Sequence, residues 1–279
     1  MSYFKVLGLE REPFSTSPDP EFFYLSKEHE TALTNTIIEL RLKRGLSVIL
    51  GDVGTGKTTL SRKLIRELKQ RNDVIFSIML DPSVENEFFF LTWLAKNFEI
   101  PISNSETVLE LRDSLEKFLF QKGVNENMTI VLVIDEAQKL SESSLETLRV
   151  LLNYETNEYK LLQLVLLGQL EFYSKIANMP NFLDRVSFKY TLNPLAFEEV
   201  REMINFRIRQ AGYTANTPLF LDEAIAEIYD YSRGYLRKTM MISHKALKAL
   251  ILNNKLSVDR LMVREIISTE VKHGWANNS

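Results

Sequence analysis

The chain has 279 residues, of which 45% are hydrophobic and 25% charged, and its formal net charge is −3. This composition is that of a soluble globular protein, and the length allows one large domain or two ordinary ones. The slightly acidic balance excludes a bulk positive field for nucleic acid or anionic lipid. The absence of cysteine excludes disulfides and thiolate metal sites. No apolar run approaches the about 18 residues of a membrane helix. We therefore expect a cytoplasmic protein without direct membrane insertion, or one held at the inner membrane through a partner.

The first 44 residues contain an aromatic segment and then a helix. The segment contains Pro13, Pro18 and Pro20, which break any helix there, and the aromatic residues Tyr3, Phe4, Phe14, Phe22, Phe23 and Tyr24. A segment this apolar either forms a strap over the domain that follows or packs into an ordinary core. After Ser26, glutamates in the first turn favour a helix to about Arg44. We assign residues 1–44 to the domain that follows.

The sequence Gly-Asp-Val-Gly-Thr-Gly-Lys-Thr-Thr at 51–59 fits the phosphate-binding pattern G-x-x-x-x-G-K-[ST]. An apolar strand at 46–50 enters it and a helix at 57–71 leaves it, which is the context that a P-loop requires. Its glycines allow a tight turn that points backbone N–H groups at phosphate oxygens. Lys57 would reach the β- and γ-phosphates, and the Thr58 hydroxyl would bind Mg²⁺. The alternative, a glycine-rich turn with an incidental lysine, leaves the complete pattern unexplained. The predicted nucleotide contacts are Gly51, Asp52, Val53, Gly54, Thr55, Gly56, Lys57, Thr58 and Thr59.

Apolar runs alternate with helical segments as far as residue 195. Besides the strand before the P-loop, buried strands are predicted at 74–80 and 128–134, and further strands at 161–167 and 186–192. Helices are predicted between them at 84–98, 105–122 and 142–153. Strands that alternate with helices form βαβ units. We therefore predict a doubly wound α/β domain over residues 45–195, with a parallel five-stranded core sheet.

The strand at 128–134 runs directly into Asp135 and Glu136. The carboxyl edge of a parallel sheet is where α/β proteins bind ligands. Asp135 would hold Mg²⁺ there, and Glu136 would be the general base for a water that attacks the γ-phosphate. The alternative is an Asp-Glu pair that caps a helix. With the P-loop upstream and no guanine-reading N-K-x-D sequence, the pair favours ATP with Mg²⁺ as the ligand.

Three further polar residues are candidates for contacts with the reacting phosphate. Gln169 follows the strand at 161–167 and could orient the attacking water, or it could simply face solvent. Arg185, just before the strand at 186–192, and Arg237, which opens a later helix, could each neutralise charge in the transition state. For either arginine, an ordinary surface position is the alternative.

From residue 196 the pattern contains helices only, at about 197–211, 219–231, 234–253 and 257–268. We predict a small helical lid domain over residues 196–272 and a polar tail over 273–279. One stripe on the third of these helices is basic and consists of Arg237, Lys238, His244, Lys245 and Lys248. The spacing of these residues fits either a solvated helix face or a contact for DNA phosphates.

Together these features resemble a AAA+ ATPase of the general-secretion-pathway A (ExeA-like) and MSHA-pilus (MshM) family. The resemblance spans nearly the whole chain. Its residues are Phe4 to Leu9, Pro13 and Phe14, Ser17 to Pro20, Phe23 to Ser26, His29, Gly51 to Thr59, Asp135 to Gln138, Leu167 to Gln169, Asn193 to Leu195, Arg207, Ala211 and Gly212, Gly234 and Arg237.

The resemblance implies a role for each candidate. The P-loop would be Walker A, and Asp135 with Glu136 would be Walker B. Gln169 would be sensor 1, Arg185 the arginine finger and Arg237 sensor 2. The residue before Arg237 is leucine, whereas members of the family more often have proline there. Secretion-type members can continue into a membrane span and a peptidoglycan-binding domain, which we do not expect here.

We therefore expect an ATP-driven assembly or remodelling factor that acts as a homo-oligomeric ring, such as a hexamer, with a protein partner in an envelope machine for secretion or a type IV pilus. One alternative is a DNA-bound AAA+ regulator of transposition, because target-selection ATPases share this core. The acidic overall charge argues against DNA. Another alternative is a nucleotide-gated scaffold with little turnover, and the presence of Glu136 argues against it.

Overall fold

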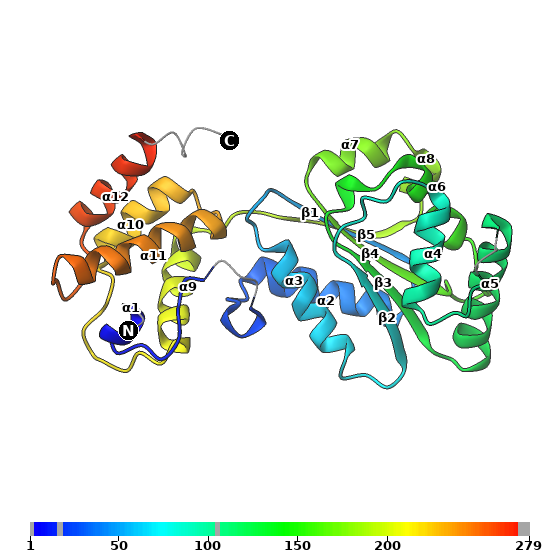
Figure 1. Cartoon of the computed structure of the whole chain (residues 1–279), viewed down its shortest axis with the longest axis horizontal. Coiled ribbons are helices and arrows are strands. Elements are labelled where there is room, and N and C mark those ends of the chain that lie inside the picture. Colours follow the sequence, from blue (N-terminus) through cyan, green and yellow to red (C-terminus); the bar gives the residue numbers. More distant parts are fainter. Residues whose placement is uncertain (1–2, 16–18, 104–106, 273–279) are drawn as a thin grey trace. The chain divides into compact units, whose positions relative to one another are not determined.

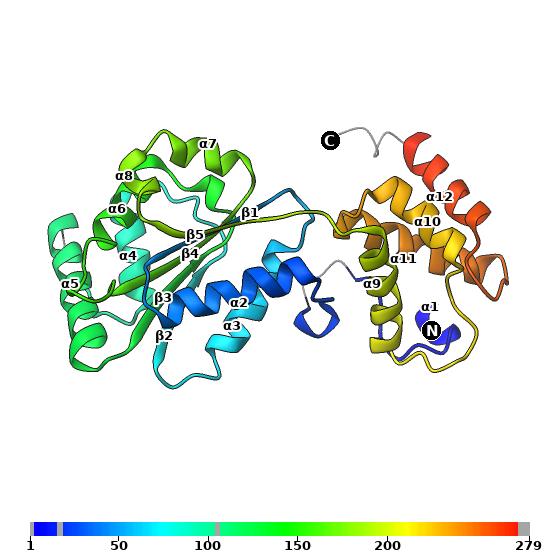
Figure 2. The ribbon, with the colours of Figure 1, turned by 180° about the vertical axis from the view of Figure 1, so that it is seen from behind.

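The computed structural model describes residues 3–15, 19–103 and 107–272, and contacts within the chain divide it into two units. The α/β unit consists of Lys27–Val53 and Leu60–Leu192. The helical unit consists of Met1–Ser26 and Asn193–Ser279, and the contacts of Gly54–Thr59 assign this short segment to the helical unit as well. Figure 1 shows both, and Figure 2 shows them from behind. Ser17, Pro18 and the predicted polar tail at 273–279 lie outside the described residues.

The α/β unit is built on a five-stranded sheet with the order β2-β3-β4-β1-β5 (Figure 1). Its strands are β1 (Leu46–Gly51), β2 (Val74–Met79), β3 (Thr129–Ile134), β4 (Leu162–Gly168) and β5 (Val186–Leu192). Every neighbouring pair is parallel. The predicted doubly wound α/β fold with a parallel five-stranded sheet is confirmed.

Helices cover both faces of this sheet, which explains the continuous apolar strands. The helices α2 (Lys27–Arg41) and α3 (Lys57–Leu68) lie on one face. The other face is covered by α4 (Glu87–Asn97), α5 (Val108–Phe120), α6 (Glu142–Leu151), α7 (Glu171–Ala177) and α8 (Pro180–Leu183) (Figures 1 and 2). The inner strands β1, β3 and β4 are buried along their whole length. At the edges, β2 and β5 are partly exposed.

The parallel arrangement brings the carboxyl ends of all five strands to the same edge of the sheet. Here β1 and β4 are neighbours, yet the helices that follow them, α3 and α7, cover opposite faces. This is a topological switch point, where α/β sheets bind their ligands. The carboxyl edge beyond β1, β3 and β4 is therefore the place to look for a site.

The helical unit contains α9 (Phe197–Gln210), α10 (Asp222–Ser232), α11 (Leu236–Leu252) and α12 (Arg260–Lys272). These confirm the predicted helical C-terminal region. The turn between α10 and α11 depends on Gly234, whose φ is +81°. A Cβ on this residue would lie 2.0 Å from the carbonyl oxygen of Leu195, so no other residue fits without a backbone shift.

The aromatic N-terminal segment differs from the sequence prediction, which placed residues 1–44 with the nucleotide domain. Residues up to Ser26 belong to the helical unit, and only the following helix, α2, belongs to the α/β unit. The segment contains two short helices, α1 (Tyr3–Val6) and a 3₁₀ turn at Pro20–Phe22. Its residues Leu9, Phe14 and Phe22 are buried in the same core as α9 to α12. Packing in a core, and not a strap over the sheet, accounts for these aromatic side chains.

A buried arginine holds this segment in place. Arg207 on α9 is 7% exposed and donates hydrogen bonds to the carbonyl oxygens of Pro13 at 2.6 Å, Phe22 at 2.8 Å and Ser15 at 3.1 Å. A guanidinium presents several N–H donors in a rigid plane, which suits three carbonyls from one loop. The packing of the N-terminal segment therefore depends on a charged residue that hydropathy alone would place at the surface.

Candidate nucleotide-binding site

The P-loop connects β1 to α3 and begins where β1 ends, at Gly51. Gly54 has a φ of +87° and Gly56 a φ of +98°, values that L residues with a Cβ rarely adopt. Lys57 is the first residue of α3 and is 7% exposed. The two glycine conformations turn the chain tightly into the helix, whose N-terminal N–H groups and positive dipole end favour an anion.

The end of β3 presents the two predicted carboxylates in different environments. Asp135 is 2% exposed, and its Oδ1 accepts a hydrogen bond from the backbone N–H of Glu136 at 2.9 Å. Glu136 is more exposed and has the left-handed backbone conformation φ +53°, ψ +38°. This conformation costs a residue with a Cβ about 1–2 kcal/mol. Such strain is concentrated at functional sites, where the surrounding structure holds it.

Gln138 joins the Walker B segment to the end of β4. Its Nε2 donates to Oε2 of Glu136 at 2.7 Å, and its Oε1 accepts from the backbone N–H of Gln169 at 3.1 Å. Gln169 directly follows β4, the neighbour of β3 in the sheet. From the sequence, Gln138 belongs to the family resemblance but has no predicted role. The sequence signal for a role of Gln138 is its position two residues after the candidate base Glu136.

The acidic residues fit a metal that arrives with a nucleotide. No cluster of three or more histidine, cysteine, aspartate or glutamate side chains in the described ranges could hold a metal ion by itself. Mg²⁺ at phosphate sites commonly takes only one or two protein oxygens and completes its shell with phosphates and water. The hydroxyl of Thr58, in the first turn of α3, and the buried carboxylate of Asp135 supply oxygens of this kind.

Arg185 lies away from these residues, before the amino end of β5. A seven-residue strand spans roughly 20 Å, so Arg185 is about that far from the carboxyl edge of its own sheet. Its guanidinium donates to the side-chain oxygen of Asn153 and to the backbone carbonyl of Asn181. The structure therefore does not bring Arg185 to the edge where Glu136 and Gln169 lie.

Arg237 is exposed in the first turn of α11, in the helical unit. Its role as sensor 2 stays a prediction. Other members of the basic stripe have partners within the same unit: Lys245 pairs with Glu270, His244 lies 2.8 Å from Glu12, and Lys248 lies over the ring of Tyr3. Arg237 and Lys248 are nevertheless exposed, and both interpretations of the stripe stay predictions.

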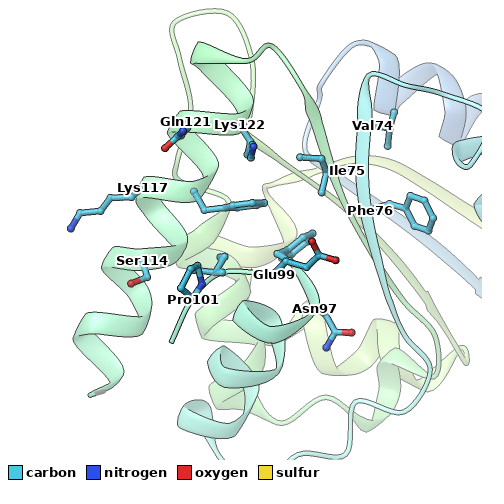
Figure 3. A pocket seen from close by; sticks show the side chains of 13 residues that line it. Val74, Ile75, Phe76, Asn97, Glu99, Pro101, Ser114, Lys117, Gln121 and Lys122 are labelled. Atoms are coloured by element: carbon cyan, nitrogen blue, oxygen red, sulfur yellow. The ribbon is translucent and has the colours of Figure 1, made fainter. Parts of the chain in front are cut away.

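A cavity of about 790 Å³ lies at the edge strand β2, beside α5 and the turn after α4 (Figure 3). Ile75, Phe98 and Phe118 are among its lining residues. It borders the first half of β2, and none of the predicted site residues lines it.

No helix in the described ranges is long and apolar enough to cross a membrane.

The AAA domain family matches residues 40–176, which include the P-loop, Walker B segment and Gln169. Over 249 residues the chain is 34% identical to General secretion pathway protein A of Aeromonas hydrophila. This match covers 88% of the chain but 44% of that protein, so the chain spans less than half the length of this relative. The chain therefore contains an AAA domain over residues 40–176.

Solved structures share the fold of this AAA+ protein at low identity. The ORC2 protein of Aeropyrum pernix has a TM-score of 0.68 and 19% identity, over 93% of this chain and 71% of that one. Cdc6p of Pyrobaculum aerophilum has a TM-score of 0.69 and 17% identity, over 88% and 67%. The RuvB branch migration motor of Thermotoga maritima has a TM-score of 0.57 and 15% identity, over 86% and 68%.

Proposed function

We propose that this AAA+ protein hydrolyses ATP with Mg²⁺ and that Glu136 is the general base. The observation that carries the proposal is the strained turn at Glu136, which lies at the carboxyl edge of the sheet with its carboxylate held by Gln138. A capping pair would need neither the strain nor the hydrogen bond from a side chain. Both features are expected where a carboxylate must point toward a reacting water.

In this mechanism the P-loop amides and Lys57 bind the β- and γ-phosphates. The Thr58 hydroxyl and the Asp135 carboxylate would supply oxygens to Mg²⁺. Mg²⁺, when bound with ATP, supplies positive charge to the phosphates. Glu136 accepts a proton from the water as the water oxygen attacks the γ-phosphorus, and the bond from phosphorus to the β–γ bridging oxygen breaks so that ADP leaves. Gln169, which directly follows β4, orients this water.

We further propose that the active form is a homo-oligomeric ring and that Arg185 completes the site of a neighbouring subunit. The support is the position of Arg185 at the amino end of β5, roughly 20 Å from the carboxyl edge of its own sheet. An arginine so placed neutralises transition-state charge only in another subunit's site. In the free chain its partners are Asn153 and Asn181, and it would exchange these for phosphate at the ring interface.

The similarity to General secretion pathway protein A supports a role in assembling an envelope machine for secretion or a type IV pilus, with the protein cytoplasmic or peripheral at the inner membrane. The DNA-binding alternative rested on the basic stripe. His244 and Lys245 lie beside Glu12 and Glu270 in the same unit, which lowers the net positive charge of the stripe. We expect duplex DNA to bind weakly and without stimulating hydrolysis. Tight, salt-sensitive binding that is lost in Lys245→Glu and Lys248→Glu would favour the alternative.

Comparison of the parent with Glu136→Gln tests the proposed ATPase. The variant keeps the phosphate-binding loop and loses only the proton acceptor. We expect it to bind ATP as the parent does and to hydrolyse it about 10²–10⁴-fold more slowly. Hydrolysis by the variant at the parent's rate would overturn the role of Glu136. A parent that binds ATP but shows no Glu136-dependent turnover would favour the nucleotide-gated scaffold.

A further inference from the structure

The side-chain amide of Gln138 has both of its ends engaged by groups of different elements. The Nε2 end donates to the Glu136 carboxylate at 2.7 Å, and the Oε1 end accepts the Gln169 backbone N–H at 3.1 Å. Gln138 lies in a short 3₁₀ turn, Ala137–Lys139, that packs next to the end of β4. The three residues therefore form one chain of hydrogen bonds from β4 to the candidate base.

Only a side chain with a donor and an acceptor at the right reach makes this bridge. A glutamate would present two acceptors, one of which would face the carboxylate of Glu136, and a lysine would present donors only. An asparagine is one methylene shorter and could not reach both partners from the same backbone position. The bridge thus depends on glutamine specifically, and packing alone gives no reason for that choice.

The bridge limits how the Glu136 carboxylate can move. Glu136 has a left-handed backbone conformation, which fixes where its side chain leaves the chain. The bond from Gln138 then fixes Oε2 of the carboxylate, so that rotation about the last side-chain torsion is restricted. A hydrogen bond to a charged acceptor is stronger than one between neutral groups, which makes this restriction effective.

We propose that Gln138 is a positioning residue that sets the Glu136 carboxylate from the end of β4, and so couples the base to the residue next to the γ-phosphate. This inference rests on the proposed ATPase function and deepens it. When the end of β4 moves, the Gln169 N–H moves with it, and the amide of Gln138 transmits the shift to the carboxylate. The position of the base then depends on what Gln169 contacts.

Gln138→Met tests this proposal, because methionine has a similar length and no amide. A displacement of a catalytic group by about 1 Å costs on the order of 10²-fold in rate. We expect kcat to fall about 10- to 100-fold, with KM for ATP and the affinity for ATP within about threefold of the parent. The matched control is Lys139→Met, in the same 3₁₀ turn, whose side chain is exposed and pairs with Asp81 at 3.5 Å. The control should keep the parent's kcat and KM.

A second pair of variants separates positioning from a general loss of structure. In Glu136→Asp the carboxylate is one methylene shorter and lies beyond the reach of Gln138. If Gln138 acts through the carboxylate, adding Gln138→Met to Glu136→Asp should lower kcat by much less than it does alone. Gln138→Asn should behave as Gln138→Met does, and melting temperatures of all variants should match the parent.

The outcomes are distinguishable. If the parent and Lys139→Met hydrolyse ATP and Gln138→Met does so within about twofold of them, this inference is wrong and the ATPase proposal stands. The inference is also wrong if the losses from Gln138→Met and Glu136→Asp multiply fully in the double variant, because the two residues would then act independently. If the parent itself does not hydrolyse ATP, both proposals are overturned.

Discussion

The two units use their charged side chains differently. In the α/β unit, the notable carboxylates lie at the carboxyl edge of the sheet, where Glu136 has a strained backbone conformation and its carboxylate accepts a hydrogen bond from a neutral amide. In the helical unit, the buried cation Arg207 binds three carbonyls of the N-terminal segment, and Nδ1 of His244 lies within hydrogen-bond distance of Tyr3 and Glu12. The first arrangement presents charge to a ligand, and the second uses charge to hold the chain together.

This difference shows when spacing in a sequence indicates a site. A residue that directly follows a buried parallel strand has its place fixed by the sheet, so Asp135 and Gln169 could be placed from the sequence. A stripe on a helix fixes only which residues share a face. What that face packs against, here Tyr3, Glu12 and Glu270, is decided by distant segments.

Arg185→Ala should give the largest effect on the α/β unit. An arginine finger is worth about 10³–10⁵ in rate, so we expect hydrolysis to fall by about 10³-fold while ATP affinity stays near that of the parent. A steady-state ATPase assay together with calorimetry checks both. The matched control is Arg149→Ala, which removes a nearby arginine that pairs with Glu146 on its own helix.

Mixing separates action in a neighbour's site from action within one subunit. Arg185→Ala and Glu136→Gln proteins, each inactive alone, should regain part of the activity when combined, because some interfaces then pair an intact arginine with an intact base. An Arg185→Ala protein that hydrolyses at the parent rate would contradict the shared site. So would a specific activity of the parent that does not change with protein concentration.

Arg207→Met sharpens the comparison from the helical side. The substitution leaves the carbonyls of Pro13, Ser15 and Phe22 without these donors, and each buried unpaired group costs about 1–3 kcal/mol. Part of this is offset because burial also disfavours the charge, which lowers the pKa of Arg207 to about 10. We expect a net loss of about 2–4 kcal/mol in the free energy of unfolding, measured by denaturant titration. Arg209→Met, an exposed control on the same helix, should change it by less than about 0.5 kcal/mol.

The sequence was sufficient for the sheet and insufficient for the N-terminal segment. Four of the five strands are runs of largely apolar residues, which in a P-loop protein indicate a parallel sheet, and the predicted bounds of all five agree with the structure to within one residue. The aromatic segment before α2 allowed two interpretations, a strap over the sheet or packing in a core. The contact that decides between them, Arg207 with the carbonyl of Pro13, joins residues 194 positions apart. The bridge made by Gln138 was missed for the same reason, since its second partner is a backbone N–H on another strand.

His244 should produce the smallest effect, as a pH dependence of stability. Burial is the main cause that lowers the pKa of His244 below 6.5, and Lys248 and Lys245 lower it further, while Glu12 opposes them. The unfolded chain therefore binds a proton more readily than the folded one as pH falls through about 6.5, and stability falls with it. We expect a small loss of stability on acidification below about pH 6.5, smaller than that from Arg207→Met.

His244→Gln should flatten this part of the pH profile and leave stability above about pH 8 close to that of the parent. Tyr3 and Glu12 still face the substituted position, so the glutamine amide has the same hydrogen-bonding neighbours as the imidazole. An unchanged slope near pH 6 in the variant would assign the dependence to other groups.

Binding of ATP to Lys57→Ala in the presence of Mg²⁺, measured by calorimetry beside the parent, tests the central claim most directly. Lys57 is the buried first residue of α3, and it is the side chain that we assign to the β- and γ-phosphates. If 51–59 is a phosphate-binding loop, the parent binds ATP and Lys57→Ala shows no measurable heat of binding at the same concentrations, while its melting temperature without nucleotide stays unchanged. Equal affinity of the two proteins for ATP would contradict the account.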